Sequence, residues 1–232
     1  MTDFDPETLK IKLALADAAT DLYLEEDGDF LIKDVAEAVD IKPGEVFNYF
    51  PNKDAILQFY YASIVFRYQL MLDEIDSFDT YTLSEKFSNF AYASFDMLNE
   101  KRAFVEQTFG RLILRSYGKT DFEKEIEGLI EQFLDEDPRL SASSEMVKNG
   151  CFYSFLRMKY LGLVRFWISD ESEGHELTME LTDKLTNFLQ ELMYNSIVDQ
   201  GFELGKFLYS NKKAFLNNIP FVKQIFSKIE IR

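Results

Sequence analysis

The chain of 232 residues is poor in the side chains that bind metals and carry redox chemistry. It contains one cysteine, Cys151, and one histidine, His175. A single cysteine excludes an internal disulfide framework and a cysteine cluster for a metal, and this usage is typical of a reducing cytoplasm. No paired-histidine or Cys/His spacing is present, so we expect no metal site and no cofactor.

The patterns of the common enzyme classes are also absent. The sequence has no glycine-rich phosphate loop, and a triad built on His175 would need distant partners. The acidic runs at 25–27 and 135–137 lack the spacing and the glycine of a calcium loop. We therefore expect a protein that is not an enzyme. His175 is expected to be a solvated residue near a helix start, with ligand or pH sensing as the alternative, and Cys151 to be a small core residue.

Long apolar runs and targeting signals are missing. The N-terminal sequence MTDFDPETLK has acidic residues where a signal peptide needs basic ones. The longest uncharged apolar stretch, FYYASIVF, is far too short to span a bilayer. These two absences predict a cytoplasmic location.

Basic residues are scarce, and they are unevenly placed. The formal net charge is −16. Residues 1–60 hold five lysines, no arginine and fourteen acidic residues, a net charge of −9, whereas residues 206–232 carry a net charge of +5. A DNA-binding domain neutralises phosphates with Lys and Arg, so the acidic N-terminal part would meet DNA with a repulsive long-range field.

Helix signals recur along the whole chain, and no strand-like alternation is present. Asp5 and Pro6 form a helix start, and capping boxes begin at Thr82 and Thr120. The patterns predict an all-α protein. Expected helices cover residues 6–27, 52–75, 101–117, 142–168 and 176–200, with two more that begin after the capping boxes.

Residues 32–57 read as helix, turn, helix, followed by the start of a longer helix. Val35, Ala36 and Val39 give the first apolar face, and Asp40 interrupts the pattern. Pro43 restarts a short helix with apolar positions at 46, 47 and 50. Asn52 then stands where the N-cap of the longer helix is expected.

This stretch resembles the DNA-reading end of the TetR/AcrR (tetracycline repressor) family of regulators. The likeness is carried by Val35-Ala36, Gly44, the run Phe47-Asn48-Tyr49-Phe50, and Lys53. It implies a three-helix head with a helix-turn-helix, a helical body that binds a ligand, and dimerisation through a four-helix bundle. The chain departs from the family at Asp40, where a glycine is usual, and at Glu45, where a small or hydroxyl residue is usual.

The resemblance implies that Tyr49 and Lys53 contact phosphates and that residues 44–48 approach base edges. Lys42, just before the second helix, adds a second phosphate site, provided that it clusters with Lys33 and Lys53. The alternative is that the aromatic residues only pack the three helices together, which we expect of Phe50 in any case. The DNA-binding candidates are Lys33, Lys42, Gly44, Glu45, Phe47, Asn48, Tyr49 and Lys53.

The chain is rich in aromatic residues, with 23 Phe and 12 Tyr. Most are expected in the core, yet a helical body of this type forms a ligand cavity between its middle helices. Few charges accompany these residues, so the expected ligand is lipophilic. For any single residue, simple core packing is an equal alternative. The cavity candidates are Phe66, Phe87, Phe90, Phe109, Phe133, Phe152 and Phe155.

Three parts of the chain are expected. Residues 1–52 form the helix-turn-helix domain, residues 53–210 the regulatory and dimerisation domain, and residues 211–232 a basic amphipathic extension. The homodimer is expected to use the two long apolar helices at about 142–168 and 176–200, because such a pair near the C-terminus suits self-association.

Two further features bear on partners. The run FWISDESEGHELTMELTDK, with the later FELGKFL, resembles a C-terminal domain found in some TetR-like bacterial proteins. Residues 221–229 carry an apolar stripe with lysines beside it, a pattern that suits an anionic membrane surface or docking onto the acidic body.

The leading hypothesis is a dimeric TetR-like transcriptional repressor that binds operator DNA and is released by a small lipophilic effector. The alternative is a lipid-binding protein of the same fold that does not bind DNA and lies at the membrane periphery. It would resemble the ubiquinone-biosynthesis lipid-binding proteins built on a TetR-like scaffold. The acidic N-terminal part favours the alternative, and the motif at 32–57 favours the repressor.

Overall fold

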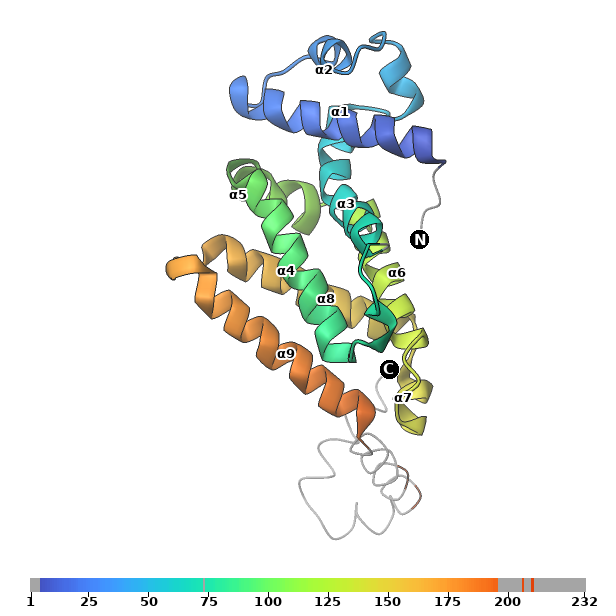
Figure 1. Ribbon diagram of the computed structural model, residues 1–232. Coiled ribbons are helices and arrows are strands. Elements are labelled where there is room, and N and C mark those ends of the chain that lie inside the picture. The colour runs from blue at the N-terminus through green and yellow to red at the C-terminus, as the bar shows by residue number, and fades with distance from the viewer. Residues whose placement is uncertain (1–4, 73, 196–205, 207–209, 211–232) are drawn as a thin grey trace.

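The computed structural model describes residues 5–72, 74–195, 206 and 210, and the extension at 211–232 lies outside them. Over the described residues the protein is all-α, as predicted, and contains no strand. Figure 1 shows α1 and α2 at one end of the molecule and α3 running from that end into a helical body. The α-helices are α1 (Pro6–Glu25), α2 (Ile32–Ala38), α3 (Lys53–Leu72), α4 (Leu83–Glu100), α5 (Arg102–Phe109), α6 (Asp121–Asp135), α7 (Ala142–Val147), α8 (Gly150–Ser169) and α9 (Glu176–Tyr194).

The head, residues 5–52, consists of α1, α2 and the short 3-10 helix η1 (Glu45–Asn48), which stands where the second helix of the motif is predicted. The Asp5 carboxylate accepts hydrogen bonds from the backbone N–H groups of Glu7 and Thr8, so the predicted cap of α1 is present. The three elements share one apolar core. Its fully buried members are Leu15, Ala16, Ala19, Val35, Ala36 and Val46.

The turn after α2 has the hydrogen bonds of a Schellman motif. The N–H of Ile41 donates to the carbonyl of Ala36 at 3.0 Å, and the N–H of Asp40 donates to that of Glu37 at 3.2 Å. Asp40 has a φ of 56°, in the left-handed region that glycine adopts at little cost. The turn therefore has a geometry that suits glycine, although an aspartate fills the position.

Replacing Asp40 by glycine is expected to raise the free energy of unfolding by about 0.5–1 kcal/mol, because it relieves the left-handed strain of a residue with a Cβ. Chemical denaturation would measure the change. Asp40→Ala is the matched control, since it removes the charge but keeps the Cβ. An equal gain in both variants would attribute the effect to charge and contradict the strain argument.

Helix α3 joins the head to the body, residues 53–195. The side chain of Asn52 accepts a hydrogen bond from the N–H of Ala55 at 2.9 Å, so the predicted N-cap is present. The helix is buried on most sides and ends at Leu72, three residues before the predicted end at Ile75. It packs against α1 in the head and against α4 and α6 in the body. A displacement of α3 therefore affects both parts.

The head also contacts the body through side chains of α1. Arg67 of α3 forms an ion pair with Asp17, in which Nη2 lies 2.8 and 2.7 Å from the two carboxylate oxygens. Lys101 pairs with Asp21, and the ring of Tyr23 packs edge-to-face on that of Phe104, with centroids 5.4 Å apart. Ion pairs this exposed contribute only about 0–1 kcal/mol each. The head is thus held by several weak contacts in addition to α3.

Both predicted capping boxes are present in the middle of the body, at Thr82 with Glu85 and at Thr120 with Glu123. The helix predicted over 101–117 is different in the structure. It consists of α5 followed by a π-helical turn, η3 (Gly110–Leu114). A π-turn has a wider hydrogen-bond spacing than the 3.6-residue pattern assumes, and such turns often occur at functional positions.

The long helix predicted over 142–168 is two helices in the structure. Helix α7 ends at Val147, and α8 begins at Gly150 with Asn149 as its N-cap, whose side chain accepts hydrogen bonds from the N–H groups of Cys151 and Phe152. Cys151 is exposed at this start, so the prediction of a core cysteine is wrong. None of the helices within the described residues combines the length and apolar character of a membrane span.

Helix α9 packs against α4 through hydroxyl groups. Thr178, Thr182 and Thr186 are buried at four-residue spacing. Thr186 Oγ1 lies 2.8 Å from Ser88 Oγ and 3.1 Å from Ser84 Oγ. Met193, near the end of the helix, is the large apolar side chain of α9 that is fully buried. Other large apolar side chains of α9 are exposed, namely Leu177, Leu185 and Phe188.

The end of α9 is tied to the start of α4 through Asp137. Its carboxylate accepts hydrogen bonds from Tyr194 at 2.5 Å and from the Arg139 guanidinium at 2.8 and 3.0 Å. The Tyr194 hydroxyl in turn accepts from the N–H of Leu83 at 2.8 Å. Burial raises the pKa of Asp137, but the hydrogen bonds from Arg139 and Tyr194 outweigh it and lower the pKa overall.

Asp137→Asn is expected to lower the free energy of unfolding at neutral pH by about 1–3 kcal/mol, because charge-assisted hydrogen bonds are lost. A carboxylate whose pKa is lowered in the folded state stabilises the protein above its ordinary pKa of 3.8, and this contribution is lost as the pH falls through the folded value. Denaturation at several pH values would therefore show that the difference in free energy of unfolding between the wild-type protein and Asp137→Asn shrinks below about pH 4. A difference that stays constant would contradict this role.

Candidate functional site

The eight predicted DNA-binding residues lie in two segments of the head and at the start of α3. One is on α2, six are in η1 and the turns on either side of it, and Lys53 opens α3. Tyr49 and Lys53 are half-buried, and the other six residues are exposed. Phe50 is 4% exposed and belongs to the core, as predicted, whereas Phe47 is 55% exposed and does not pack the three helices together.

Two lysines of this region lie against aromatic rings. The ammonium of Lys53 is 4.9 Å from the centroid of Phe30, and that of Lys12 is 4.6 Å from the centroid of Phe50. Burial lowers the pKa of Lys12. The exposed lysines of the predicted set are those at 33 and 42. The predicted set therefore offers an anionic partner two exposed lysines, at 33 and 42, and the half-buried Lys53.

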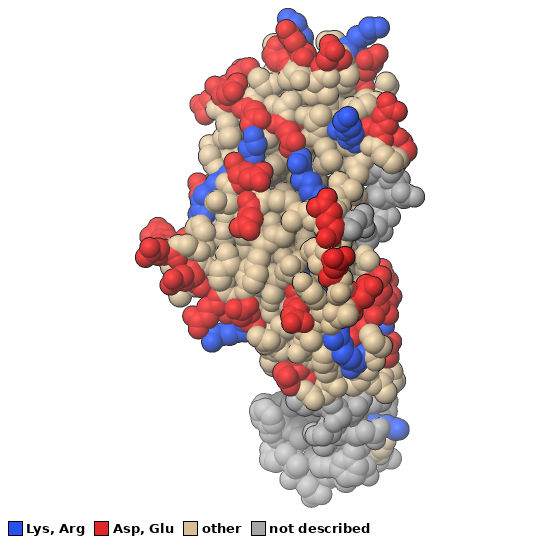
Figure 2. All heavy atoms as spheres, in the orientation of Figure 1, with Lys and Arg blue, Asp and Glu red and all other residues tan. Residues whose placement is uncertain are grey.

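The same surface carries negative charge. Glu45 is exposed at the start of η1, and its carboxylate accepts a hydrogen bond from the N–H of Lys42 at 3.0 Å. Asp40 is exposed in the preceding turn. Figure 2 shows acidic side chains along the visible face of the head, with few basic ones among them. The electrostatics of the head thus oppose the approach of a polyanion at long range.

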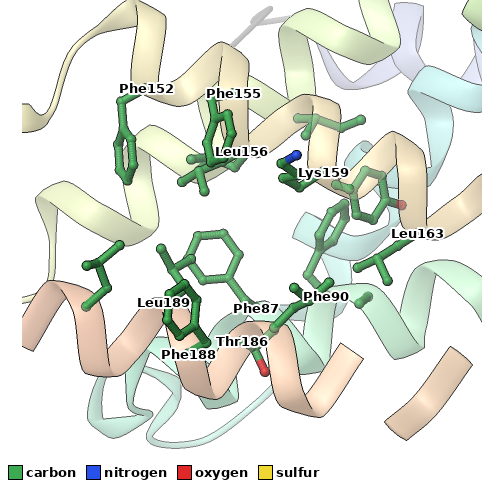
Figure 3. A pocket seen from close by; sticks show the side chains of 16 residues that line it. Phe87, Phe90, Phe152, Phe155, Leu156, Lys159, Leu163, Thr186, Phe188 and Leu189 are labelled. Atoms are coloured by element: carbon green, nitrogen blue, oxygen red, sulfur yellow. The ribbon is translucent and has the colours of Figure 1, made fainter. Parts of the chain in front are cut away.

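The body contains an apolar cavity of about 240 Å³ between α4, α6, α8 and α9. Figure 3 shows side chains of α8 on one side of it, side chains of α9 on the other, and phenylalanines of α4 between them. Phe155, Leu185 and Phe188 both line the cavity and are exposed, so the cavity reaches the surface between α8 and α9. The lining residues are Phe87, Phe90, Ala91, Ile126, Ile130, Phe152, Phe155, Leu156, Lys159, Tyr160, Leu163, Leu185, Thr186, Phe188, Leu189 and Leu192.

Seven phenylalanines are predicted to line a cavity, and the structure divides them into two groups. The four that line this cavity are Phe87, Phe90, Phe152 and Phe155. The other three, Phe66, Phe109 and Phe133, are buried in the core and are not among the residues that line this cavity. The reason is that aromatic neighbours fill the space around them: Phe66 stacks on Phe59, Phe109 packs on Tyr61, and Phe133 packs on Phe78.

Sequence reasoning misses most of the cavity wall on α8 and α9. On α8 the lining positions 152, 155, 156, 159 and 163 follow helical spacing, and on α9 positions 185, 188, 189 and 192 do the same. The apolar pattern of α9 by itself suggests only self-association. The signal that identifies the wall is a pair of matching stripes on two helices that a short loop joins.

Polar groups are few in the cavity wall. Lys159 is the charged lining residue, and its ammonium lies 4.8 Å from the centroid of Phe155. Tyr160 is buried, stacks on Phe90 with ring centroids 5.0 Å apart, and has its pKa raised by burial, so it stays protonated. The hydroxyl of Thr186 is engaged with serine hydroxyls of α4. The cavity therefore suits a mainly apolar ligand.

One cavity residue connects the site to α3. Phe90 packs edge-to-face on Tyr68 of α3, with ring centroids 5.0 Å apart. The Tyr68 hydroxyl donates to the side chain of Asn89 at 2.9 Å. Tyr68 directly follows Arg67, which pairs with Asp17 in the head. A ligand that moves Phe90 would therefore press on the helix that carries the head.

His175 is not among the cavity residues, and it is half-buried rather than solvated as predicted. Its Nε2 is 2.8 Å from Arg102 Nη1, and its Nδ1 is 3.0 Å from the carbonyl oxygen of Asp170. Since a guanidinium nitrogen is always a donor, Nε2 accepts and Nδ1 carries the proton. His175 therefore joins α5 to the loop before α9.

The protein thus consists of a head of two α-helices and one 3-10 helix on an all-helical body. Residues 86–208 match the family model described as "Tetracyclin repressor-like, C-terminal domain". This match covers more than half of the chain, so the protein belongs to the tetracycline-repressor-like family, and the predicted family is confirmed. The family supports a transcriptional regulator as the general class of function, and its regulators are generally not enzymes.

The fold is also that of a solved structure. The crystal structure of the TetR transcriptional regulator from Nitrosomonas europaea ATCC 19718 is similar with a TM-score of 0.56 and 19% identity, covering 79% of this chain and 98% of that chain. At this identity the likeness concerns the fold alone. No curated protein matches the chain.

Proposed function

We propose that the protein is a dimeric regulator that binds operator DNA through its head and is released by a lipophilic effector in the body cavity. The observation that carries this proposal is the contact between Phe90 in the cavity wall and Tyr68 on α3, the helix that also carries the head. An effector that binds one position of α3 more tightly than the other would shift the two heads of a dimer relative to each other.

At the DNA, the exposed Phe47 and Asn48 would approach base edges, while Lys42, Tyr49 and Lys53 would contact phosphates. The lysine at position 33 would add charge at the start of α2. Because the carboxylates at 40 and 45 lie on the same part of the head, we expect the long-range attraction to DNA to be weak.

A gel-shift assay against genomic fragments over a range of salt concentrations tests DNA binding. Lys42→Gln is expected to weaken binding and reduce the slope of log affinity against log salt by about one unit, as for one lost phosphate contact. Lys124→Gln is the control, since Lys124 is an exposed lysine on α6 in the body. If the wild-type protein binds no fragment even at low salt, the regulator proposal fails.

The acidic head favours a second candidate, a lipid-binding protein of the same fold without DNA binding. This candidate needs the cavity but not the lysines of the head. Native mass spectrometry of the freshly purified protein separates the two in part, since one spectrum reports the dimer mass and any retained lipid. Retained lipid together with a failed gel shift would support the lipid carrier.

A further inference from the structure

The cavity wall has a charge of one sign only. Of its 16 lining residues, Lys159 is the cationic one and none is acidic. The chain as a whole has 41 acidic and 25 basic residues. A lysine at the edge of an apolar cavity is therefore opposite in sign to the net charge of the protein, and it would attract an anionic group.

The surroundings of Lys159 differ from those of most lysines in the body. Those at 101, 119, 124, 148 and 184 each pair with a carboxylate. Among the residues that the structure describes, no carboxylate forms an ion pair with Lys159, and its ammonium lies over the ring of Phe155 instead. An ammonium group in a cation–π contact can still form an ion pair with an anion, which is the stronger interaction.

The position of Lys159 matches a ligand with two unlike ends. Lys159 is exposed, whereas Phe90, Ala91 and Ile126 form a buried part of the wall. In Figure 3 Lys159 lies on α8 at the side of the cavity. An anionic end could pair with the lysine close to water while an apolar chain fills the interior, so no charge would be buried without a partner.

We propose that the cavity takes a single-chain amphiphile with one anionic end, a long-chain carboxylate, with its chain among the apolar residues and its carboxylate on Lys159. The inference rests on the proposed function, in which this cavity holds the effector, and it adds the chemical class of that effector.

Calorimetric titration with decanoate, decanol and decylamine, each below its solubility limit and below any micelle concentration, tests the inference. Decanoate is expected to bind about twofold to fivefold more tightly than decanol, and decylamine most weakly. Lys159→Gln is expected to reduce decanoate affinity to that of decanol and to leave decanol unchanged, whereas Lys159→Arg keeps the preference. Lys184→Gln, which alters a paired lysine on α9, is the control and should change nothing.

A second variant locates the binding. Leu189→Trp fills the cavity from its half-exposed wall and is expected to weaken decanoate and decanol alike, whereas unchanged affinity would place the binding elsewhere and overturn the inference. Equal wild-type affinities for decanoate and decanol would overturn the anionic class and leave an apolar effector in place. Binding of none of the three compounds would overturn the cavity as an effector site and with it the ligand part of the proposed function.

Discussion

Met158→Asp is expected to convert the proposed dimer into a monomer. Met158 of α8 is 55% exposed, and it lies on a stripe with Phe155 and Phe166, which are exposed as well. On α9 the outward side chains Leu177 and Phe188 are also exposed. Soluble proteins rarely leave a large contiguous apolar surface uncovered, so we infer that a second copy covers it.

The threonines on the inner face of α9 support the same inference. The buried side chains of α9 are Thr178, Thr182, Thr186 and Met193, and Thr186 bonds to serines of α4, so the exposed Leu177 and Phe188 are not needed for the core of one chain. A buried carboxylate without a partner is strongly destabilising, and one aspartate in each copy would bring two of them into the interface. We expect the dimer to weaken by at least about 100-fold, since two such penalties exceed about 2.7 kcal/mol.

Analytical ultracentrifugation over a range of protein concentrations would measure the change. Met71→Asp is the matched control, because Met71 is a similarly exposed methionine at the end of α3 and lies outside the proposed interface. Unchanged dimer mass in Met158→Asp would place the interface elsewhere. Loss of the dimer in both variants would show that added charge alone is responsible.

Trp167→Ala is expected to lower the free energy of unfolding by about 3–5 kcal/mol, in the range of large core truncations. Trp167 is 1% exposed and stacks on Phe95 at an interplanar angle of 7°. The guanidinium of Arg102 lies 4.7 Å from its ring centroid, and the ring of His175 is 5.6 Å away. The indole therefore fills the junction of α4, α5, α8 and the loop before α9.

Thermal unfolding followed by circular dichroism would measure this loss, because the variant has no other tryptophan for fluorescence. Trp167→Phe is the matched control and is expected to lose less than half as much stability as Trp167→Ala, since a ring still packs on Phe95. A small loss in Trp167→Ala would mean that the neighbouring helices collapse into the space.

Sequence reasoning succeeds where one residue decides a local structure. The caps at Asp5, Asn52, Thr82 and Thr120 follow from a side-chain oxygen that satisfies free N–H groups, and all four are present. It fails where the backbone leaves the regular helix. The break at Asn149 and the π-turn after α5 change the course of the chain without interrupting its apolar pattern.

The cavity could be predicted only in part for a different reason. Spacing shows that Phe109 and Phe152 are on apolar faces, but not which face meets empty space. In the structure Phe109 is packed against Tyr61 and Phe152 borders the cavity. Only the relative placement of α4, α6, α8 and α9 shows which phenylalanine is packed in the core and which borders the cavity.

Three side chains border the cavity and also lie on the exposed face: Phe155, Leu185 and Phe188. They therefore link ligand binding to the association of two subunits. A second subunit on that face would change the surroundings of the same side chains that touch a ligand. By reciprocity, ligand affinity would then vary with protein concentration, and subunit exchange would vary with ligand. Titrations at nanomolar and micromolar protein are therefore expected to give different apparent dissociation constants.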